Sequence, residues 1–441
     1  MSQQYHTFDL NSMMYAMPTR GFIPVAAPVH RMPNEILGEI FDWLLRSRVP
    51  PLQPQARRTF TPTLATPMLV SHVCSHWRRV VLNIVSQWTY LEMNSTRHPD
   101  VFAELVDRSK KFPLGLAIAL PTLNVELCAE DRQVEFRKTF KILKSHAARL
   151  RCLHIRTNNP TFFLIFSKYL KKVNFSALET LILEQVDPRG RMYHVGPVTF
   201  NPTTFRTLRL ENIVIECDAT CLASLQTLYL INSSGTLLDQ TQLSHATYPL
   251  IPTAPTMTRL RDLKIDKTNI IPTTALPTPS FTSASLRRLH LARIRIPTEQ
   301  AVRFVDRLLY ITYTPLLEEL ILDDLDPDAF LRFMMHLEAP PTPPATATPK
   351  YARVRRLSLV KLNLAILNQN FMNAFPRVVE LHLVELNPMP MALLLEDPAF
   401  MPYLTSFRVN HLCFRRVTIA PPGPPLALAP APAPPLPPVN N

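Results

Sequence analysis

The residue pair whose spacing comes nearest to a catalytic or metal-binding motif is His72 and His76. Two histidines four residues apart lie on one face of a helix and can bind zinc, as they do in metalloproteases. In those enzymes a glutamate general base follows the first histidine, whereas this sequence has Val73 there. A histidine pair facing solvent or a partner protein therefore explains the pattern better than a metal site.

Other candidate sites are incomplete in the same way. Asp323, Asp324, Asp326 and Asp328 suggest calcium, but the glycine and the final glutamate of an EF-hand loop are missing, so a helix N-terminus explains them better. The six cysteines contain no CxxC pair, and the chain has neither a glycine-rich phosphate loop nor a G-x-S-x-G elbow. We therefore expect a protein that is not an enzyme, with no cofactor and no metal. A hydrolase site assembled from distant residues stays open as an alternative.

The composition indicates a globular chain with a large core. Of 441 residues, 46% are hydrophobic and 18% charged, and the 45 prolines are many beside only 7 glycines. The net charge of +13 is compatible with nucleic acid or an acidic partner. The basic residues form dispersed pairs such as Arg287-Arg288 and Arg355-Arg356, and no block of five occurs. This dispersal favours an ordinary basic surface over a dedicated nucleic-acid face, so we expect no nucleic-acid partner.

Targeting signals do not stand out in the sequence. The first thirty residues lack a charged start followed by a long apolar run, and no uninterrupted apolar stretch approaches the length of a membrane span. The few scattered cysteines are typical of a reducing compartment. We therefore expect no membrane partner and a location in the cytoplasm, the nucleus or both.

Two apolar helical segments near the start of the chain organise the rest. Met32–Phe41 begins with a proline suited to the first turn of a helix, and its apolar residues recur at helical spacing. Met68–Val81 repeats this arrangement and carries Trp77, and an aromatic stretch closes the region at residues 87–91. Two or three helices this short have more apolar surface than they can bury against one another, so we expect them to bind a partner.

These segments resemble an F-box, a family that has a proline-started L-P-x-E-I-L-x-E-I-F helix followed by V-C-x-x-W-R and a terminal tryptophan. Met32 stands in place of the usual leucine, and a proline-rich link separates the two helical segments. The resemblance implies a module that docks on the Skp-type adaptor of a cullin–RING ubiquitin ligase. The residues that it implies for adaptor binding are Met32, Pro33, Ile36, Leu37, Ile40, Phe41, Leu69, Val70, Val73 and Trp77.

The remainder of the chain repeats the pattern L-x-x-L-x-L with aliphatic or aromatic substitutes. Ten occurrences begin 20 to 37 residues apart, at residues 150, 178, 205, 225, 260, 286, 317, 354, 378 and 404. Their average spacing of about 28 lies near the upper end of the leucine-rich-repeat range. One such strand cannot bury its apolar face, but strands stacked in parallel can. Residues 298–310 and 327–337 should supply outer helices.

The predicted fold class is therefore α/β. A small N-terminal helical F-box-like module precedes an irregular leucine-rich-repeat solenoid with parallel strands on the concave face and helices outside. The repeats are degenerate, so a mixed α/β layer structure remains an alternative. The expected parts are a disordered arm (1–29), the F-box-like module (30–93), linking helices and a first strand (94–149), the repeat domain (150–419) and a disordered proline-rich tail (420–441).

The side chain between the last two apolar residues of each repeat should point to the concave face. These residues form a predicted ladder, which consists of His154, Ile182, Arg209, Tyr229, Lys264, His290, Ile321, Ser358, His382 and Arg408. We expect its polar members, His154, Arg209, Tyr229, Lys264, His290, His382 and Arg408, to contribute to a surface that binds a protein substrate. Glu318, Glu319, Asp323 and Asp324 should add an acidic zone.

The predicted function is that of a substrate-recognition subunit of a Skp–cullin–F-box ubiquitin ligase. The N-terminal helices would dock on the adaptor, and the repeat domain would hold a protein substrate of unknown identity. The alternative is a leucine-rich-repeat scaffold that binds protein or RNA and has no ubiquitin-ligase role. Binding to the adaptor distinguishes the two.

Overall fold

The structure is a computed structural model of the chain. The described residues divide into two compact units, and the boundary lies between Trp88 and Thr89. Each unit is described by itself. The residues that the structure describes are 32–48, 65–94, 99–120, 129–158, 162, 165–166, 168–169, 173–186, 193–198, 201, 203–217, 223–232, 258–266, 285–293, 314–327, 330, 351–362, 374–384, 403–409 and 412–415.

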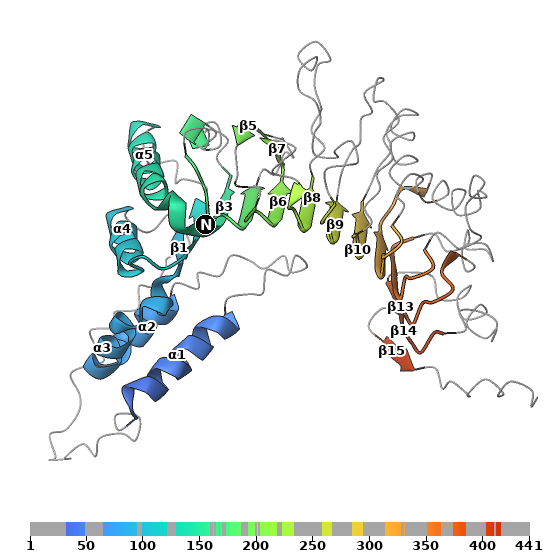
Figure 1. Cartoon of the computed structure of the whole chain (residues 1–441), viewed down its shortest axis with the longest axis horizontal. Helices are drawn as coiled ribbons and strands as arrows, with labels where there is room; N and C mark the ends of the chain where they lie inside the picture. Colours follow the sequence, from blue (N-terminus) through green and yellow to red (C-terminus); the bar gives the residue numbers. More distant parts are fainter. Residues whose placement is uncertain are drawn as a thin grey trace, which may run out of the picture. The chain divides into compact units, whose positions relative to one another are not determined.

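The first unit is helical, and Figure 1 draws its helices in blue. It contains α1 (Asn34–Arg48), α2 (Ala65–Val73), α3 (Ser75–Asn83) and the short 3-10 helix η2 (Val85–Trp88). Helix α1 begins directly after Pro33, whose carbonyl accepts a hydrogen bond from the Leu37 N–H at 3.1 Å. Proline is favoured there because its missing N–H would have no partner in the first turn.

Helices α2 and α3 meet at Cys74, which has an extended backbone with φ −159°. The Cys74 Sγ accepts a hydrogen bond from the Trp77 N–H at 3.4 Å, so the side chain caps the start of α3. A cap is needed because the first N–H groups of a helix have no partner within the helix. The break at Cys74 changes the direction of the chain between the two halves of the apolar segment 68–81.

The second unit is built on a 13-stranded sheet in which every neighbouring pair from β1 to β14 is parallel. The last strand, β15 (Leu412–Arg415), pairs antiparallel with β14. In spatial order the parallel strands are β1 (Tyr90–Asn94), β2 (Leu114–Leu120), β3 (Leu150–Thr157), β4 (Thr180–Gln185), β6 (Thr207–Glu211), β8 (Thr227–Ile231), β9 (Asp262–Asp266), β10 (Arg288–Ala292), β11 (Glu319–Asp323), β12 (Arg356–Val360), β13 (Glu380–Val384) and β14 (Ser406–Val409). Strands β5 (Tyr193–Val198) and β7 (Ile213–Cys217) form a separate pair.

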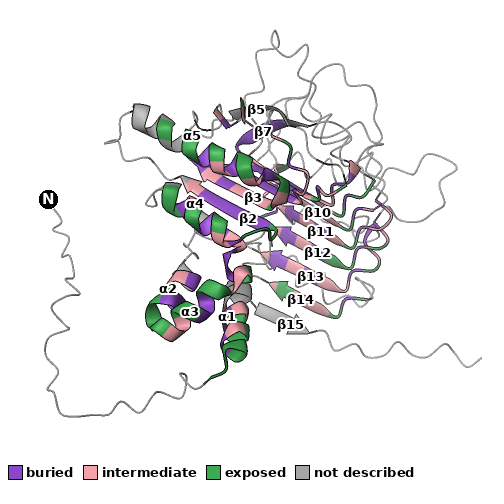
Figure 2. Cartoon of the chain, turned by 60° about the vertical axis from the view of Figure 1, so that its left-hand side comes forward, coloured by how far each residue is buried: buried purple, intermediate pink, exposed green. Residues whose placement is uncertain are grey.

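Two helices cover one face of the sheet at its beginning. Figure 2 shows α4 (Pro99–Arg108) and α5 (Ala129–His146) in front of β2 and β3, and the short helix η3 (Ala147–Arg149) leads from α5 into β3. Helices α4 and α5 and strand β2 lie within residues 94–149, where linking helices and a first strand were expected. Strand β1 belongs to the sheet and spans Tyr90–Asn94, so it extends across residue 93, the expected end of the helical module.

Each of the ten L-x-x-L-x-L segments enters a strand of the parallel sheet, and its apolar residues point into the core. The first apolar residue is fully buried in all ten segments, from Leu150 to Leu404. The second and third are also buried in the first nine segments, whereas Phe407 and Val409 of the last segment are partly exposed. The periodicity therefore predicted the buried face correctly. A parallel sheet of repeat-like units is compatible with the expected solenoid.

A left-handed residue follows several of the strands, and its N–H fixes the register with the next strand. These residues are Asn212, Asn232, Arg293, Asp324 and Lys361, with φ between 48° and 57°. Each donates its N–H to the carbonyl of the last residue of the neighbouring strand, at 2.7 to 3.0 Å. Asparagine and aspartate adopt this conformation more readily than most residues because their short side chains bond locally.

Asn212 adds side-chain hydrogen bonds to this arrangement. It is buried, and its amide nitrogen donates to the carbonyl of Gln185 on the preceding main-sheet strand. Its amide oxygen accepts from the side chain of Asn232, the left-handed residue of the following repeat. Asn212 therefore links three consecutive repeats, which a residue without an amide cannot do.

Several expected elements lie outside the described residues. They are the arm at 1–29, the helix at 298–310, most of the helix at 327–337 and the tail at 420–441. Within the described parts of the chain, no helix has the length and apolar character needed to cross a membrane.

Candidate functional site

Helix α1 carries two apolar stripes side by side, and only one of them is buried within the helical unit. Leu37 and Phe41, each 1% exposed, form a core with Val70 of α2 and with Val80 and Val81 of α3. This core holds the three helices together.

The second stripe of α1 consists of Ile36, Ile40 and Trp43, which are 45%, 38% and 68% exposed. Their spacing of four and three residues places them on one helix face, next to the face that packs inward. Single exposed apolar residues are common on protein surfaces, but three large apolar side chains together on one helix face form a patch, and such patches often mark interaction sites.

The residues predicted to bind the adaptor therefore divide into two groups. Met32, Ile36, Ile40, Leu69 and Val73 are exposed apolar side chains, and Pro33 is also exposed. Leu37, Phe41 and Val70 are buried, and Trp77 packs partly buried against them with its ring centroid 5.1 Å from that of Phe41. The buried members position the exposed members. Sequence reasoning did not separate the two groups and did not include Trp43.

Polar contacts hold the end of the helical unit against α1. Asp42 Oδ1 accepts hydrogen bonds from Ser86 Oγ at 3.0 Å and from Gln87 Nε2 at 2.7 Å. Trp88 Nε1 donates to the Val81 carbonyl at 3.2 Å. Because η2 is anchored in this way, α1 keeps a defined orientation relative to α3, and its exposed stripe is presented by a folded unit.

The second candidate surface is the face of the sheet opposite the buried leucines. The strand register places the predicted ladder residues side by side on neighbouring strands, from His154 in β3 to Arg408 in β14. We call them the middle row. The residues two positions later in each strand lie on the same face. We call this second set the end row, and its charged members are Arg156, Glu184, Glu211, Asp266 and Asp323.

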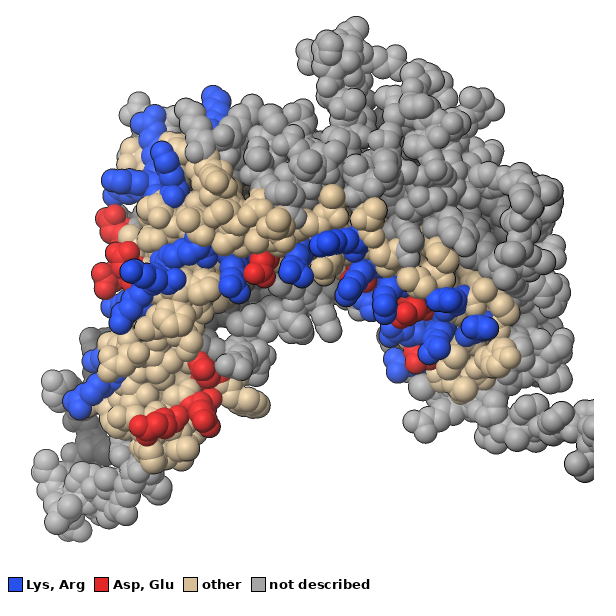
Figure 3. Space-filling view, viewed as in Figure 1, with Lys and Arg blue, Asp and Glu red and all other residues tan. Residues whose placement is uncertain are grey.

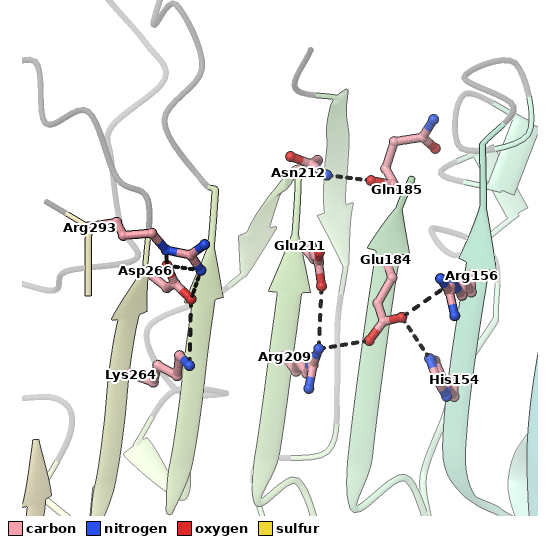
Figure 4. Close-up of polar contacts among 10 residues, drawn as sticks. All are labelled: His154, Arg156, Glu184, Gln185, Arg209, Glu211, Asn212, Lys264, Asp266 and Arg293. Carbon is pink, nitrogen blue, oxygen red and sulfur yellow. Dashed lines mark hydrogen bonds and ion pairs between the residues drawn. The ribbon is translucent and has the colours of Figure 1, made fainter. Parts of the chain in front are cut away.

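Basic side chains from both the middle row and the end row lie around the carboxylate of Glu184, as Figure 4 shows. Its carboxylate lies 3.1 Å from Arg209 Nη2, 3.4 Å from His154 Nε2 and 4.0 Å from Arg156 Nε. Burial alone raises the pKa of Glu184, but the interaction with His154 and the charges of Arg209 and Arg156 outweigh it, so its pKa lies below the usual value. Glu184 is therefore held ionised within a cluster of cations.

Asp266 forms a similar cluster in β9, three strands further along the sheet than Glu184. Arg293 donates to both carboxylate oxygens, from Nε at 2.8 Å and from Nη2 at 2.7 Å, and Lys264 Nζ lies 3.5 Å away (Figure 4). Such a two-pronged pair is among the stronger hydrogen-bonded contacts. Burial lowers the pKa of Lys264, and Asp266 opposes this effect.

Arginines pair with two of the four carboxylates of the expected acidic zone, Glu318 and Glu319. Glu318 lies 3.3 Å from Arg287, and His290 Nε2 lies 3.9 Å from Asp323. Glu319 lies 2.7 Å from Arg288 and also 3.3 Å from Arg356 Nη2. The sequence shows adjacent carboxylates here, but the parallel register places arginines and a histidine of neighbouring strands opposite them. The zone therefore carries much less free negative charge than the local sequence indicates.

The middle row itself presents little free charge in its first half. The side chains of His154, Arg209, Lys264 and His290 are only 13% to 17% exposed, and Tyr229 is buried. Burial raises the pKa of the Tyr229 hydroxyl and lowers that of His382, whose pKa Arg408 also lowers. Arg408 is the exposed member of the predicted set. The predicted row exists, but its carboxylate partners in the end row were not predicted.

No group of three or more histidine, cysteine or acidic side chains is arranged to hold a metal ion in the part of the chain that the structure describes. Comparison of the sequence with protein-family models and with curated proteins finds no match. The resemblance of residues 32–41 and 68–81 to an F-box therefore stands on those residues alone. What the geometry adds is a folded helical unit with an exposed apolar stripe and a parallel sheet with a charged open face.

Proposed function

We propose that the chain is a substrate-recognition subunit of a Skp–cullin–F-box type ubiquitin ligase. The helical unit docks on the Skp-type adaptor, and the sheet unit holds a protein substrate. The observation that carries the proposal is the exposed stripe of Ile36, Ile40 and Trp43, which lies in the segment with the F-box-like pattern. Exposed aliphatic and aromatic side chains on a rigid helix supply the buried centre of a protein interface.

The mechanism in this proposal is proximity. A chain that binds the adaptor through one unit and a substrate through the other raises the effective concentration of the substrate near the ligase. The transfer chemistry belongs to other subunits, so the chain itself is not an enzyme. The apolar stripe, with Leu69 and Val73 of α2, would form part of an interface of about 1,200–2,000 Å² in total if its size is ordinary.

The burial of these side chains decides which substitutions test adaptor binding without unfolding the helical unit. Leu37 lies in the core of the helical unit, so Leu37→Asp would unfold the unit and remove binding for a trivial reason. Ile36→Asp and Ile40→Asp alter exposed side chains and leave that core intact. Co-expression of the chain with a Skp-type adaptor, followed by affinity purification, should recover a complex for the unchanged chain and none for the double variant.

The opposite result would favour the other function. If the unchanged chain does not purify with the adaptor, the helical unit is a cap or serves another partner. The chain would then be a scaffold that binds protein or RNA through its sheet unit.

A further inference from the structure

One set of exposed cations in the sheet unit lies at the beginnings of the strands. The residue after the first apolar position of each repeat occupies this place, and we call this set the edge row. Its members are Arg151, Glu179, Arg206, Gln226, Arg261, Arg287, Glu318, Arg355, Val379 and Thr405. All five of its arginines are exposed. In Figure 3, Lys and Arg side chains follow the sheet with fewer Asp and Glu between them.

A chain of backbone hydrogen bonds joins the members of the edge row. The carbonyl of each accepts the N–H of the next, so that Arg206 bonds to Gln226, Gln226 to Arg261 and Arg261 to Arg287, each at 2.8 Å. The same contact continues through Glu318 to Thr405 at 2.8 to 3.0 Å. Because neighbouring strands lie about 4.8 Å apart, the row is a closely spaced and rigid line of side chains.

Three of the five arginines in the edge row form no ion pair with a described carboxylate, although the charge of Arg261 acts on the neighbouring Asp262 and lowers its pKa against the effect of burial. Glu179 pairs with Arg151 at 3.5 Å and Glu318 with Arg287 at 3.3 Å. Within the described residues, Arg206, Arg261 and Arg355 have no carboxylate within ion-pair distance. The edge row therefore differs from the middle row, where Glu184 and Asp266 already hold the basic side chains.

More exposed arginines lie close to this row. Arg353 and Arg377, which each lie two residues before the edge-row position of their repeats, are exposed and likewise have no carboxylate partner among the described residues. In the sequence these arginines are separated by twenty or more residues and look dispersed. The repeat spacing brings them to one border of the sheet.

We propose that the edge row binds an acidic segment of another polypeptide. Arginine suits carboxylates because its planar guanidinium can donate two parallel hydrogen bonds. A polypeptide can place its carboxylates opposite Arg206, Arg261 and Arg355 and leave Glu179 and Glu318 uncontacted. A nucleic-acid strand would be held here by phosphate contacts alone, because the row contains no aromatic side chain on which a base could stack.

This inference depends only on the surface of the sheet unit. It holds whether or not the helical unit docks on a ligase adaptor, and it is tested without the adaptor. Failure of adaptor binding and failure of the edge row are therefore separate outcomes.

The test is a fluorescence-anisotropy titration of the purified full chain with a fluorescein-labelled poly-glutamate peptide. The edge variant carries Arg206→Gln, Arg261→Gln and Arg355→Gln. The control variant carries Lys111→Gln, Arg137→Gln and Lys141→Gln, which removes the same charge from exposed sites of the same unit outside the row. We expect the edge variant to bind the peptide about tenfold more weakly and the control to change affinity by less than about twofold.

A labelled oligouridylate of equal net charge tests the other class of partner. The proposal predicts weaker binding of this RNA than of poly-glutamate at the same salt concentration, and no extra loss in the edge variant relative to the control. Equal loss of peptide binding in both variants would show a non-specific charge effect and overturn the proposal. Tighter RNA binding that depends on the edge arginines would overturn it in favour of nucleic acid.

Discussion

Arg209 and Glu184 pair across two neighbouring strands, with 3.1 Å between Arg209 Nη2 and Glu184 Oε1, on side chains that are only 16% and 12% exposed. Removing Glu184 takes away this partner and leaves Arg209 paired with Glu211, whose Oε2 lies 3.3 Å from Arg209 Nη2. We therefore expect Glu184→Gln to lower the free energy of unfolding of the sheet unit by about 1.5–3 kcal/mol at neutral pH, the usual cost of losing a hydrogen bond to a charged group. Denaturant unfolding at pH 7 measures the loss.

The pH dependence of this loss has a defined sign. The pKa of Glu184 is lower in the folded chain than the ordinary value of 4.5, so the ionised group stabilises the folded state above pH 4.5. That stabilisation disappears as the pH falls through the folded-state pKa. The difference between the unchanged chain and Glu184→Gln should therefore be constant near neutrality and shrink below pH 4.5. A difference that grows on acidification would contradict the assignment of Glu184 as an ionised group.

Asn212 tests the links between consecutive repeats. Asn212→Ala removes the amide that contacts Gln185 and Asn232, at a residue whose φ is 57°. Lys361→Ala is a matched control, because Lys361 has φ 54° and is exposed. We expect Asn212→Ala to cost about 1–3 kcal/mol because a buried carbonyl and an amide lose their partners. The control should cost less than about 1 kcal/mol, as measured by thermal or denaturant unfolding.

Cys152 tests the packing at the start of the sheet. Burial, with a smaller contribution from Glu179, raises the pKa of its thiol to about 12, so almost no thiolate is present at neutral pH. We expect iodoacetamide to modify Cys152 far more slowly in the folded chain than in denaturant, because the thiolate is the reactive form. Site-resolved mass spectrometry of a labelling time course measures both rates. Similar rates in the two states would show that β3 is not packed as described.

The repeat spacing predicted the buried side of the sheet because each strand alternates between two faces. Leu153 and Ile155 point inward for that reason alone, and His154 between them must lie on the open face. The pairing of His154 with Glu184 was not predictable in the same way. It depends on the register between two strands separated by a connection of more than twenty residues, and Glu184 is one position beyond the repeated pattern.

The helical unit shows the same limit. The apolar spacing predicted α1, but Ile36 and Leu37 are equally apolar in sequence, and only the packing of α2 and α3 decides which is buried. The arginines of the edge row look dispersed in sequence because a period of about 28 residues separates them. These arginines lie close together because the repeats stack on one another. A charged surface of this kind is found in a sequence only when residues at the same position of successive repeats are compared.

The most direct measurement of the central claim is the affinity of the purified full chain for a purified Skp-type adaptor, obtained by isothermal titration calorimetry. We predict that Ile36→Asp with Ile40→Asp weakens binding at least about a hundredfold, because the substitutions place charges in the centre of the interface. Val101→Asp changes an apolar side chain of α4 that is 46% exposed and serves as the control. It should bind like the unchanged chain, and all three proteins should have the same circular-dichroism spectrum. Equal affinity of the double variant and the unchanged chain, or no binding by any of them, would contradict the account.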